Sequence, residues 1–245
     1  MKGVILAGGL GRRLEPLTRI TNKHLLPVYN KPMIYYPIQT LVNAGIRDIM
    51  IVTGGNNAGD FLRLLGNGQE FGLNDINYTY QRGERGIADA LSLAEHFADG
   101  EKIVVILGDN VIEKSIKKYV QKFSRQPKGA RILIKQVPDP ERFGVVQLKA
   151  KRIIKIHEKP KNPKTNYIVT GIYMYDAQVF EIIRRLKPSQ RGELEITDVN
   201  NAYIRKSQLY YDILDGYWTD CGLPETLYRA TTLVRRKLSK HNKSR

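Results

Sequence analysis

A glycine-rich segment follows the first apolar run of the chain and has the residue types of a phosphate-binding turn. It reads Ala7-Gly8-Gly9-Leu10-Gly11-Arg12-Arg13-Leu14. Glycines let a backbone turn sharply and approach a ligand without a Cβ clash, and their amide N–H groups can form a nest for an anion. Arg13 adds a planar, permanent positive charge suited to phosphate. We therefore predict a phosphate site, with a mere tight turn as the alternative.

Two familiar nucleotide-binding loops do not fit this segment. A Walker A loop ends in Gly-Lys-Ser or Gly-Lys-Thr, and the chain has neither at this place. A dinucleotide fingerprint needs a third Gly or Ala where this chain has Leu14, and an acid about 20 residues further on. No acid occurs between Glu15 and Asp48. If the loop binds phosphate, it therefore does so as a different kind of site.

Two aspartates are candidates for holding a metal ion. Asp109 follows the apolar run Ile103–Leu107 and one glycine. A carboxylate at the carboxyl end of such a strand sits where open α/β sheets bind ligands. Asp220 lies in a second turn, Trp218-Thr219-Asp220-Cys221-Gly222. Mg²⁺ in proteins prefers one or two carboxylates together with substrate phosphates and water; a turn-forming or helix-capping role is the alternative for each residue.

Strands separated by helices are predicted in the first half of the chain, which indicates βαβ units and a parallel sheet. The predicted strands are Lys2–Ala7, Asp48–Thr53, Ile76–Tyr80 and Ile103–Leu107, and the helices are Ile34–Ala44, Ala58–Leu65 and Gly86–Phe97. The second half reads as hairpins and later helices. Its predicted strands are Arg131–Val137, Gly144–Leu148, Arg152–His157, Ile168–Tyr175 and Leu209–Leu214, and its helices are Glu193–Lys206 and Thr226–Leu238.

We therefore expect an α/β fold with a Rossmann-like, mixed and mainly parallel central sheet flanked by helices, and a smaller hairpin-rich part. One domain is predicted over residues 1–245. Within it, residues 1–110 form a nucleotide-binding half, residues 111–225 a second half, and residues 226–245 a terminal helix and basic tail.

Composition points to an anionic partner. The formal net charge is +16, from 40 basic and 24 acidic residues. Nucleic acid and phosphorylated small molecules both fit that charge, but the aromatics do not interleave with basic clusters, so we expect no nucleic-acid partner. Apolar runs are too short to cross a bilayer, and no signal peptide is evident. With one cysteine, Cys221, these features predict a cytoplasmic protein without a membrane partner.

An ordered series of motifs resembles the glucose-1-phosphate thymidylyltransferase family of sugar nucleotidylyltransferases. The resemblance covers roughly residues 1–228. Its motifs are Gly8 to Leu14, Pro16-Leu17-Thr18, Lys23 to Pro27, Lys31 to Ile34, Gln81, Gly86 to Ala90, Leu107 to Asn110, Arg142 to Val146, Glu158-Lys159-Pro160, Val169 to Tyr173, Arg191 to Asp198 and Trp218 to Gly222.

The resemblance implies that a sugar 1-phosphate attacks the α-phosphorus of a pyrimidine nucleoside triphosphate and releases pyrophosphate. Arg13 and Lys23 then match the family's catalytic residues, and Asp109 and Asp220 match the ligands of Mg²⁺. The nucleotide-binding matches are Leu6, Gly8, Gly9, Gly11, Gln81, Gly86 and Asp109. The matches on the sugar-phosphate side are Asn110, Gly144, Glu158, Lys159, Val169, Gly171 and Arg191.

Both reactants are polyanions, so the chemistry needs charge neutralisation and in-line positioning rather than a covalent intermediate. The amide of Gln81 fits the O4/N3–H edge of thymine or uracil. That edge leaves UTP, or both nucleotides, as alternatives to dTTP. A glycosyltransferase that consumes a nucleotide sugar is a more distant alternative. Trp218 would form an apolar wall of the site or simply pack in the core.

Departures from the family pattern occur near the end of the chain. Cys221 stands where close members usually carry Thr. Long members continue past this point with helices that help form an oligomer interface and an allosteric site. We therefore expect a short-form enzyme without feedback at that site, and a homo-oligomer stays open.

Overall fold

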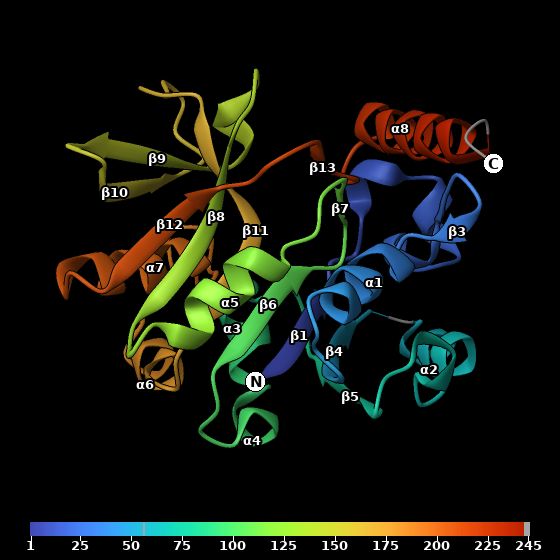
Figure 1. Ribbon diagram of the computed structural model, residues 1–245, viewed down its shortest axis with the longest axis horizontal. Helices are drawn as coiled ribbons and strands as arrows, with labels where there is room; N and C mark the ends of the chain where they lie inside the picture. Colours follow the sequence, from blue (N-terminus) through green and yellow to red (C-terminus); the bar gives the residue numbers. More distant parts are fainter. Residues whose placement is uncertain (56, 243–245) are drawn as a thin grey trace.

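The computed structural model describes residues 1–55 and 57–242; residues 243–245 of the predicted basic tail lie outside the described range. Four parallel strands form the first half of the central sheet (Figure 1). These are β1 (Lys2–Ala7), β4 (Asp48–Gly54), β5 (Asp75–Gln81) and β6 (Ile103–Leu107). β1 lies between β4 and β6, and β5 pairs with β4. Because parallel strands end at the same edge, the loops after β1, β5 and β6 meet there.

Strands of the second half continue the same sheet. They are β8 (Ala130–Gln136), β9 (Gly144–Lys149), β10 (Arg152–Glu158), β11 (Tyr167–Tyr175) and β12 (Leu209–Ile213). β11 runs antiparallel to β6, β8 and β9, and β12 is parallel to β8. β9 and β10 form a hairpin that extends away from β4 and β5 (Figure 1). The predicted mixed, mainly parallel sheet is therefore confirmed.

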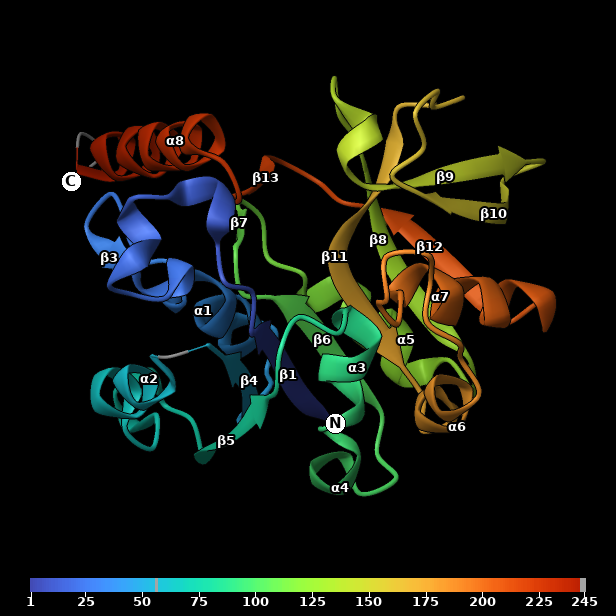
Figure 2. The same cartoon turned by 180° about the vertical axis from the view of Figure 1, so that it is seen from behind.

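Helices cover both faces of the sheet (Figures 1 and 2). One face packs against α1 (Tyr35–Asn43), α2 (Ala58–Leu65) and α5 (Lys117–Arg125). The opposite face packs against α3 (Ile87–Ser92), α4 (Glu95–Ala98), α6 (Gln178–Arg184) and α7 (Ile196–Arg205). Two hydrophobic layers thus hold the sheet between them.

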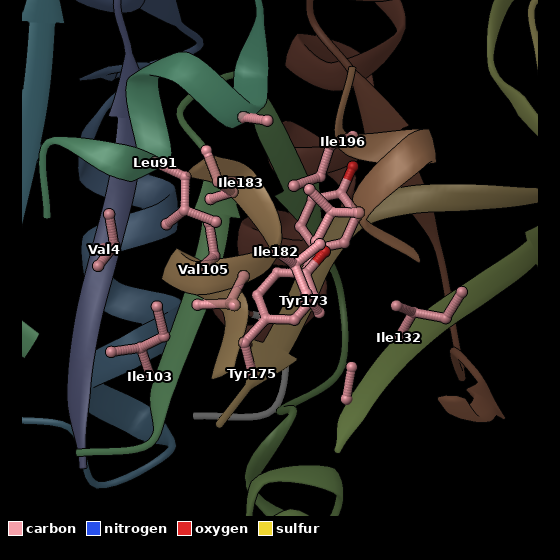
Figure 3. Packing of buried hydrophobic residues seen from close by; sticks show 14 of the residues in the cluster. Val4, Leu91, Ile103, Val105, Ile132, Tyr173, Tyr175, Ile182, Ile183 and Ile196 are labelled. Carbon is pink, nitrogen blue, oxygen red and sulfur yellow. The ribbon is translucent and has the colours of Figure 1, made fainter. Parts of the chain in front are cut away.

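Burial on both faces explains why the parallel strands read as continuous apolar runs. In β1, Val4 packs into the layer under α3, whereas its neighbour Ile5 packs into the layer under α1. Figure 3 shows the first layer, to which Val4 on β1, Leu91 on α3, Val105 on β6 and Tyr173 on β11 all contribute. Tyr173 and Tyr175 stack with ring centroids 5.8 Å apart.

Three smaller units complete the fold beside the sheet edge. Two short strands, β2 (Pro27–Val28) and β3 (Lys31–Pro32), pair antiparallel. β7 (Asn110–Ile112) pairs with β13 (Trp218–Asp220), so the end of the chain returns to the loop after β6. The terminal helix α8 (Pro224–Asn242) lies against β2 and β13 (Figure 2). No helix within the described ranges is long and apolar enough to span a membrane.

Three helix predictions were wrong in their bounds, and α5 and α6 were not predicted. The terminal helix, predicted as Thr226–Leu238, extends further at both ends as α8 (Pro224–Asn242). The predicted helix Gly86–Phe97 is divided into α3 and α4. The helix predicted from Glu193 begins only at Ile196. The residues just before α7 bond to another segment and do not join the helix. Leu194 N–H donates to Arg85 O at 2.9 Å, and Leu194 O accepts from Ala88 N–H at 3.1 Å. These bonds fasten the start of α3 to the start of α7.

Candidate active site

The glycine-rich loop leaves β1 and turns back over the edge of the sheet. Gly11 has φ +71°, and a Cβ at this residue would lie 2.8 Å from Cβ of Lys23. Only glycine combines that backbone with such a close approach. A short 3₁₀ turn, Arg12–Leu14, follows and buries Leu14. One guanidinium nitrogen of Arg13 lies 3.1 Å from where a Cβ of residue 222 would stand, so Arg13 reaches toward the turn that carries Asp220.

A capped turn positions Lys23. The 3₁₀ turn Lys23–Leu25 begins at Asn22, whose Oδ1 accepts from the backbone N–H of His24 at 3.0 Å. The same oxygen lies 2.7 Å from Nδ1 of His24. Because that oxygen can only accept, Nδ1 carries the proton. Burial, with the Lys23 charge beside it, lowers the pKa of His24 to about 3, so the ring packs under the site as a neutral group.

Lys23 and Asp109 form a mostly buried ion pair at the centre of the site. Lys23 Nζ lies 2.7 Å from Asp109 Oδ2, and the two side chains are only 14% and 13% exposed. Burial alone would raise the pKa of Asp109. The Lys23 ammonium outweighs burial and holds that pKa at about 2. Asp109 is therefore an anion at neutral pH.

Asp220 reaches the same place through backbone pairing. β13 sets Asp220 opposite Asn110 of β7, and Cys221 N–H donates to Asp109 O at 2.9 Å. Burial raises the pKa of Asp220, and the negative charge of Asp109 raises it further. Arg142 partly offsets this, because its Nη2 lies 2.9 Å from Asp220 Oδ2. Two carboxylates that repel each other in a cavity are a donor set that fits a hard divalent cation such as Mg²⁺.

The predicted base-reading residues lie at the end of β5. Gln81 is the last residue of that strand, and its side chain is buried. Gly86 has φ +98°, and a Cβ there would lie 2.5 Å from Leu194 O. The turn between β5 and α3 is thus held tightly against the chain before α7, and no other residue type would fit at position 86.

The predicted sugar-phosphate residues come from the second half. Glu158 ends β10, and its Oε2 accepts from Thr197 Oγ1 at 2.5 Å. Its Oε1 lies 3.7 Å from Lys159 Nζ and 3.6 Å from Arg191 Nη2. Arg191 itself is bonded to Glu195, with Nη2 to Oε1 at 2.9 Å. This side therefore combines one acceptor with two cations.

A single cavity of about 380 Å³ joins these groups. Its walls include almost all of the predicted residues. They are Leu6, Gly8, Gly9, Arg13, Lys23, Gln81, Gly86, Asp109, Asn110, Gly144, Glu158, Lys159, Val169, Gly171 and Asp220. Gly11 and Arg191 do not line it. Gly11 instead shapes the turn around Lys23, and Arg191 contacts two residues of the cavity wall, Glu158 and Glu193.

Comparison with known proteins agrees with this geometry. Residues 2–237 match the nucleotidyl transferase family. A glucose-1-phosphate thymidylyltransferase of Neisseria meningitidis serogroup A is 44% identical over 238 residues, which are 96% of this chain and 82% of the relative. The chain belongs to the nucleotidyl transferase family. A glucose-1-phosphate thymidylyltransferase of Actinoplanes sp. is 43% identical and spans 96% of this chain and 78% of its own length.

Solved structures place this transferase in the same group. A crystal structure of a candidate glucose-1-phosphate thymidylyltransferase from Bacillus anthracis, in complex with a sucrose, is 52% identical. It superposes with a TM-score of 0.91 over 96% of this chain and 95% of its own. A UDP-glucose pyrophosphorylase complexed with UDP-glucose is 25% identical, with a TM-score of 0.83 over 96% and 98% of the two chains. The family resemblance predicted from the motifs is confirmed.

Several residues of the transferase cavity had no predicted role. Arg142 links Asp220 to Asp139, at 2.9 Å and 2.7 Å. His24 and Thr197 also line the cavity. Trp218, which was predicted as a wall of the site or a core residue, lines it as well. Trp218 is both wall and core, since its ring is buried and its Nε1 donates to Asn110 Oδ1 and Thr170 O. Arg142 lies inside one of the family motifs, but its partner Asp220 is far away in sequence, so no local pattern could have paired them.

Proposed function

We propose that this nucleotidyltransferase joins glucose 1-phosphate to dTTP, giving dTDP-glucose and pyrophosphate, with Mg²⁺ as its metal. The relatives named glucose-1-phosphate thymidylyltransferase support the substrates, because they match nearly the whole chain at 41–44% identity. The cavity supports the reaction type. It has a base-reading amide at one end, a carboxylate with two cations at the other, and the Lys23–Asp109 pair in the cavity wall.

That arrangement in one cavity is the observation on which the proposal rests. Gln81 and Gly86 come from the nucleotide half, and Glu158 and Lys159 from the sugar half. A substrate held at each end would meet the other beside Asp109. The joining of two held substrates avoids most of the entropy loss of a bimolecular encounter.

Charge neutralisation is the part of the chemistry that the side chains supply. The phosphate oxygen of the sugar attacks the α-phosphorus, and the bond to the pyrophosphate group breaks in line with it. In this proposal Arg13 stabilises negative charge on the triphosphate, because the guanidinium extends from the glycine loop toward the Asp220 turn. Lys23, fixed by its turn and by Asp109, offers its remaining N–H groups to a phosphate oxygen.

The sugar end needs groups for hydroxyls and for one phosphate. Glu158 Oε1 accepts no hydrogen bond within the described part of the chain, so it is free to accept one from a sugar hydroxyl. Lys159 and Arg191 place positive charge beside it for the sugar's phosphate. Arg191 must leave or share Glu195 to reach that phosphate, since its Nη2 and Nε are bonded to Glu195 here.

Asp109 and Asp220 would hold Mg²⁺. When bound, the ion supplies positive charge to phosphate oxygens and so favours the attack. The two carboxylates fit it because both are buried and the charge on one raises the pKa of the other. Lys23 and Arg142 each bond to Oδ2 of one carboxylate, so a cation would be held mainly by the two Oδ1 atoms, of which that of Asp109 also accepts from Asn110 Nδ2 at 3.4 Å.

UTP is a second candidate nucleotide. Gln81 would read the same edge of uracil as of thymine, since the two bases differ only at the methyl group. The structural relative that is a UDP-glucose pyrophosphorylase, complexed with UDP-glucose, supports this alternative. The transferase would then use both pyrimidine nucleotides, with dTTP favoured by its sequence relatives.

Pyrophosphate release tests the proposal. The wild-type chain is incubated with Mg²⁺, glucose 1-phosphate and each of dTTP, UTP, CTP, ATP and GTP. We expect release with dTTP or UTP, and its loss in Asp109→Ala. A matched control is Asp60→Ala, a partly exposed aspartate of α2 that pairs only with Arg63 and Asn57 among the described residues. Absence of release with every triphosphate and every common sugar 1-phosphate would contradict the proposal.

A further inference from the structure

The amide of Gln81 is held by two oxygen acceptors on one side. Gln81 Nε2 lies 3.0 Å from the backbone oxygen of Gly86 and 2.9 Å from Oδ2 of Asp89. A peptide oxygen can only accept, and so can an ionised carboxylate. The terminal atom that faces both of them must therefore be the NH₂ group. The chemistry of the neighbours fixes this orientation, independently of how an amide is drawn.

The carbonyl oxygen of Gln81 consequently faces the cavity. Oε1 lies 2.9 Å from where a Cβ of Gly8 would stand, beside the glycine loop. No group in the described residues donates a hydrogen bond to this oxygen. Both N–H bonds of the amide are already used. Toward a bound base, Gln81 thus offers an acceptor and no donor.

Asp89 is positioned by the backbone at the start of α3. It lies in the first turn of α3, and its other oxygen, Oδ1, is 3.6 Å from Nε of Arg85. The start of the helix is tied to the chain before α7 through Ala88 and Leu194, with N–H to O at 3.1 Å. Gly86, whose oxygen is the second acceptor, also receives Ala90 N–H at 3.2 Å. The two acceptors therefore keep their places relative to Gln81.

We propose that Asp89 is a positioning residue for base selection: it fixes the amide of Gln81 so that the site accepts bases with an N–H at this edge and rejects cytosine. The inference rests on the proposed reaction and on Gln81 as its base reader. Thymine and uracil carry an N3–H that can donate to Oε1. Cytosine has a bare N3 there, so two acceptors would face each other and neither would be satisfied.

A purely structural role for Asp89 has a different consequence. An aspartate in the first turn stabilises a helix by interaction with its dipole. Loss of that effect would lower the stability of α3 and would affect all nucleotides alike. Orientation of Gln81, by contrast, changes the ratio between bases. The ratio of kcat/KM for UTP to that for CTP is therefore the readout, since these nucleotides differ only in the base.

The test compares the wild-type chain with Asp89→Asn. An Asn side chain can turn its own NH₂ toward Gln81, so Gln81 gains a second orientation with Nε2 toward the cavity. We expect the wild type to prefer UTP over CTP by about 100-fold, the range that an unpaired buried polar group produces. In Asp89→Asn we expect this preference to fall by about tenfold, as one of two acceptors is lost. Gly86 O remains, so some preference survives.

Binding measured without turnover compares UTP with CTP independently of catalysis. UTP and CTP are titrated calorimetrically into each variant without sugar phosphate, and the ratio of the two Kd values should shrink in Asp89→Asn. Asp60→Asn on α2 is the control that removes a first-turn carboxylate away from the cavity. Asp89→Ser, which also removes the obligatory acceptor, replaces Asp89→Asn if thermal melting shows that the latter does not fold.

The outcomes separate the two proposals. A wild-type preference for UTP that Asp89→Asn and Asp89→Ser keep within twofold would overturn the role of Asp89 and leave the proposed function standing. Equal loss of UTP and CTP turnover would do the same, because it indicates a structural role alone. A wild-type chain that uses neither dTTP nor UTP would remove the proposed function itself.

Discussion

Lys23 Nζ and Asp109 Oδ2 lie 2.7 Å apart, across 85 intervening residues, and each is the nearest opposite charge of the other in the cavity wall. The pair connects the capped turn after the glycine loop to the end of β6. It also sets the charge state of the site, because Lys23 keeps the pKa of Asp109 at about 2 against the effect of burial. The same lysine therefore competes with a metal ion for Asp109.

Removal of Lys23 should separate metal binding from catalysis. In Lys23→Met we expect the affinity for Mn²⁺, a spectroscopic substitute for Mg²⁺, to rise about tenfold, since a positive charge beside the carboxylates is lost. Turnover should nevertheless fall by about 100-fold, because a group that stabilises the phosphates is gone. The free energy of unfolding without metal should drop by about 3 kcal/mol, as for a broken buried pair. Electron paramagnetic resonance, pyrophosphate release and urea unfolding measure the three effects.

A matched ion pair away from the cavity controls this experiment. Arg131 and Asp212 are bonded between β8 and β12, both side chains are 13% exposed, and Lys122 Nζ also lies 2.5 Å from Asp212 Oδ1. Arg131→Met should therefore destabilise the fold less than Lys23→Met, because Lys122 still pairs with Asp212, and it should not change the affinity for Mn²⁺. Weaker Mn²⁺ binding in Lys23→Met than in the wild type would contradict the competition between Lys23 and a metal ion for Asp109.

The buried ring of His24 should make stability depend on pH above the range where carboxylates titrate. Its pKa is lowered from 6.5 to about 3 in the fold. Between these values the unfolded chain binds a proton that the folded chain does not, so stability falls as the pH falls below 6.5. Each pH unit in this window should cost up to about 1.4 kcal/mol. Urea unfolding at pH 7.0, 6.0 and 5.0 measures the slope.

Replacement of the ring removes that slope. In His24→Asn the side-chain amide can still donate to Asn22 but does not titrate. Between pH 7 and 5 the free energy of unfolding should therefore change with pH less steeply than in the wild type, by about 1 kcal/mol per pH unit. His96, which is exposed on α4, provides the control. His96→Asn should keep the wild-type slope. Equal slopes in wild type and His24→Asn would mean that the ring is protonated in the fold.

The parallel strands could be predicted from the sequence because their side chains are buried on both faces. Lys2–Ala7 and Ile103–Leu107 were predicted with the bounds that the structure has. The break between α3 and α4 could not be predicted, since Ala94 and Phe97 continue the apolar spacing of the helix. Only the structure shows that the segment bends there to stay against the sheet.

For the candidate site, too, some features could be predicted from the sequence and others could not. Asp109 could be recognised because it follows a predicted strand, and Gln81 and Asp220 through their matches to the family motifs. The strand pairing that brings Asp220 to Asp109 could not be predicted, because β7 and β13 meet across more than 100 residues of chain and no local pattern encodes that pairing. The orientation of Gln81 by Asp89 was equally invisible, although the two residues are close in sequence, since it depends on the turn at Gly86.

Gly8 should tolerate no larger side chain. A Cβ there would lie 2.9 Å from Gln81 Oε1, and that oxygen cannot retreat freely because the amide is bonded to Gly86 and Asp89. Gly8→Ala should therefore displace the base-reading amide and raise the KM for dTTP by about tenfold, the effect of one misplaced hydrogen bond. Steady-state kinetics with varied dTTP measure it. Gly59→Ala, in α2 with no atom near its Cβ position, should leave this KM unchanged.

Glu158 should affect the sugar rather than the nucleotide. Thr197 Oγ1 donates to Oε2 at 2.5 Å and thereby aims Oε1 at the cavity, between Lys159 and Arg191. Glu158→Gln keeps the shape but loses the charge and one acceptor. We expect the KM for glucose 1-phosphate to rise about 10- to 100-fold, since a hydrogen bond to a charged group contributes about 1.5–3 kcal/mol. The KM for dTTP should change less than twofold, because Gln81 and Gly86 lie at the other end of the cavity.

Glu181→Gln, at an exposed glutamate of α6, is the control. If Glu158→Gln raised the KM for dTTP as much as that for the sugar, the two ends of the cavity would not be the separate subsites that the geometry indicates.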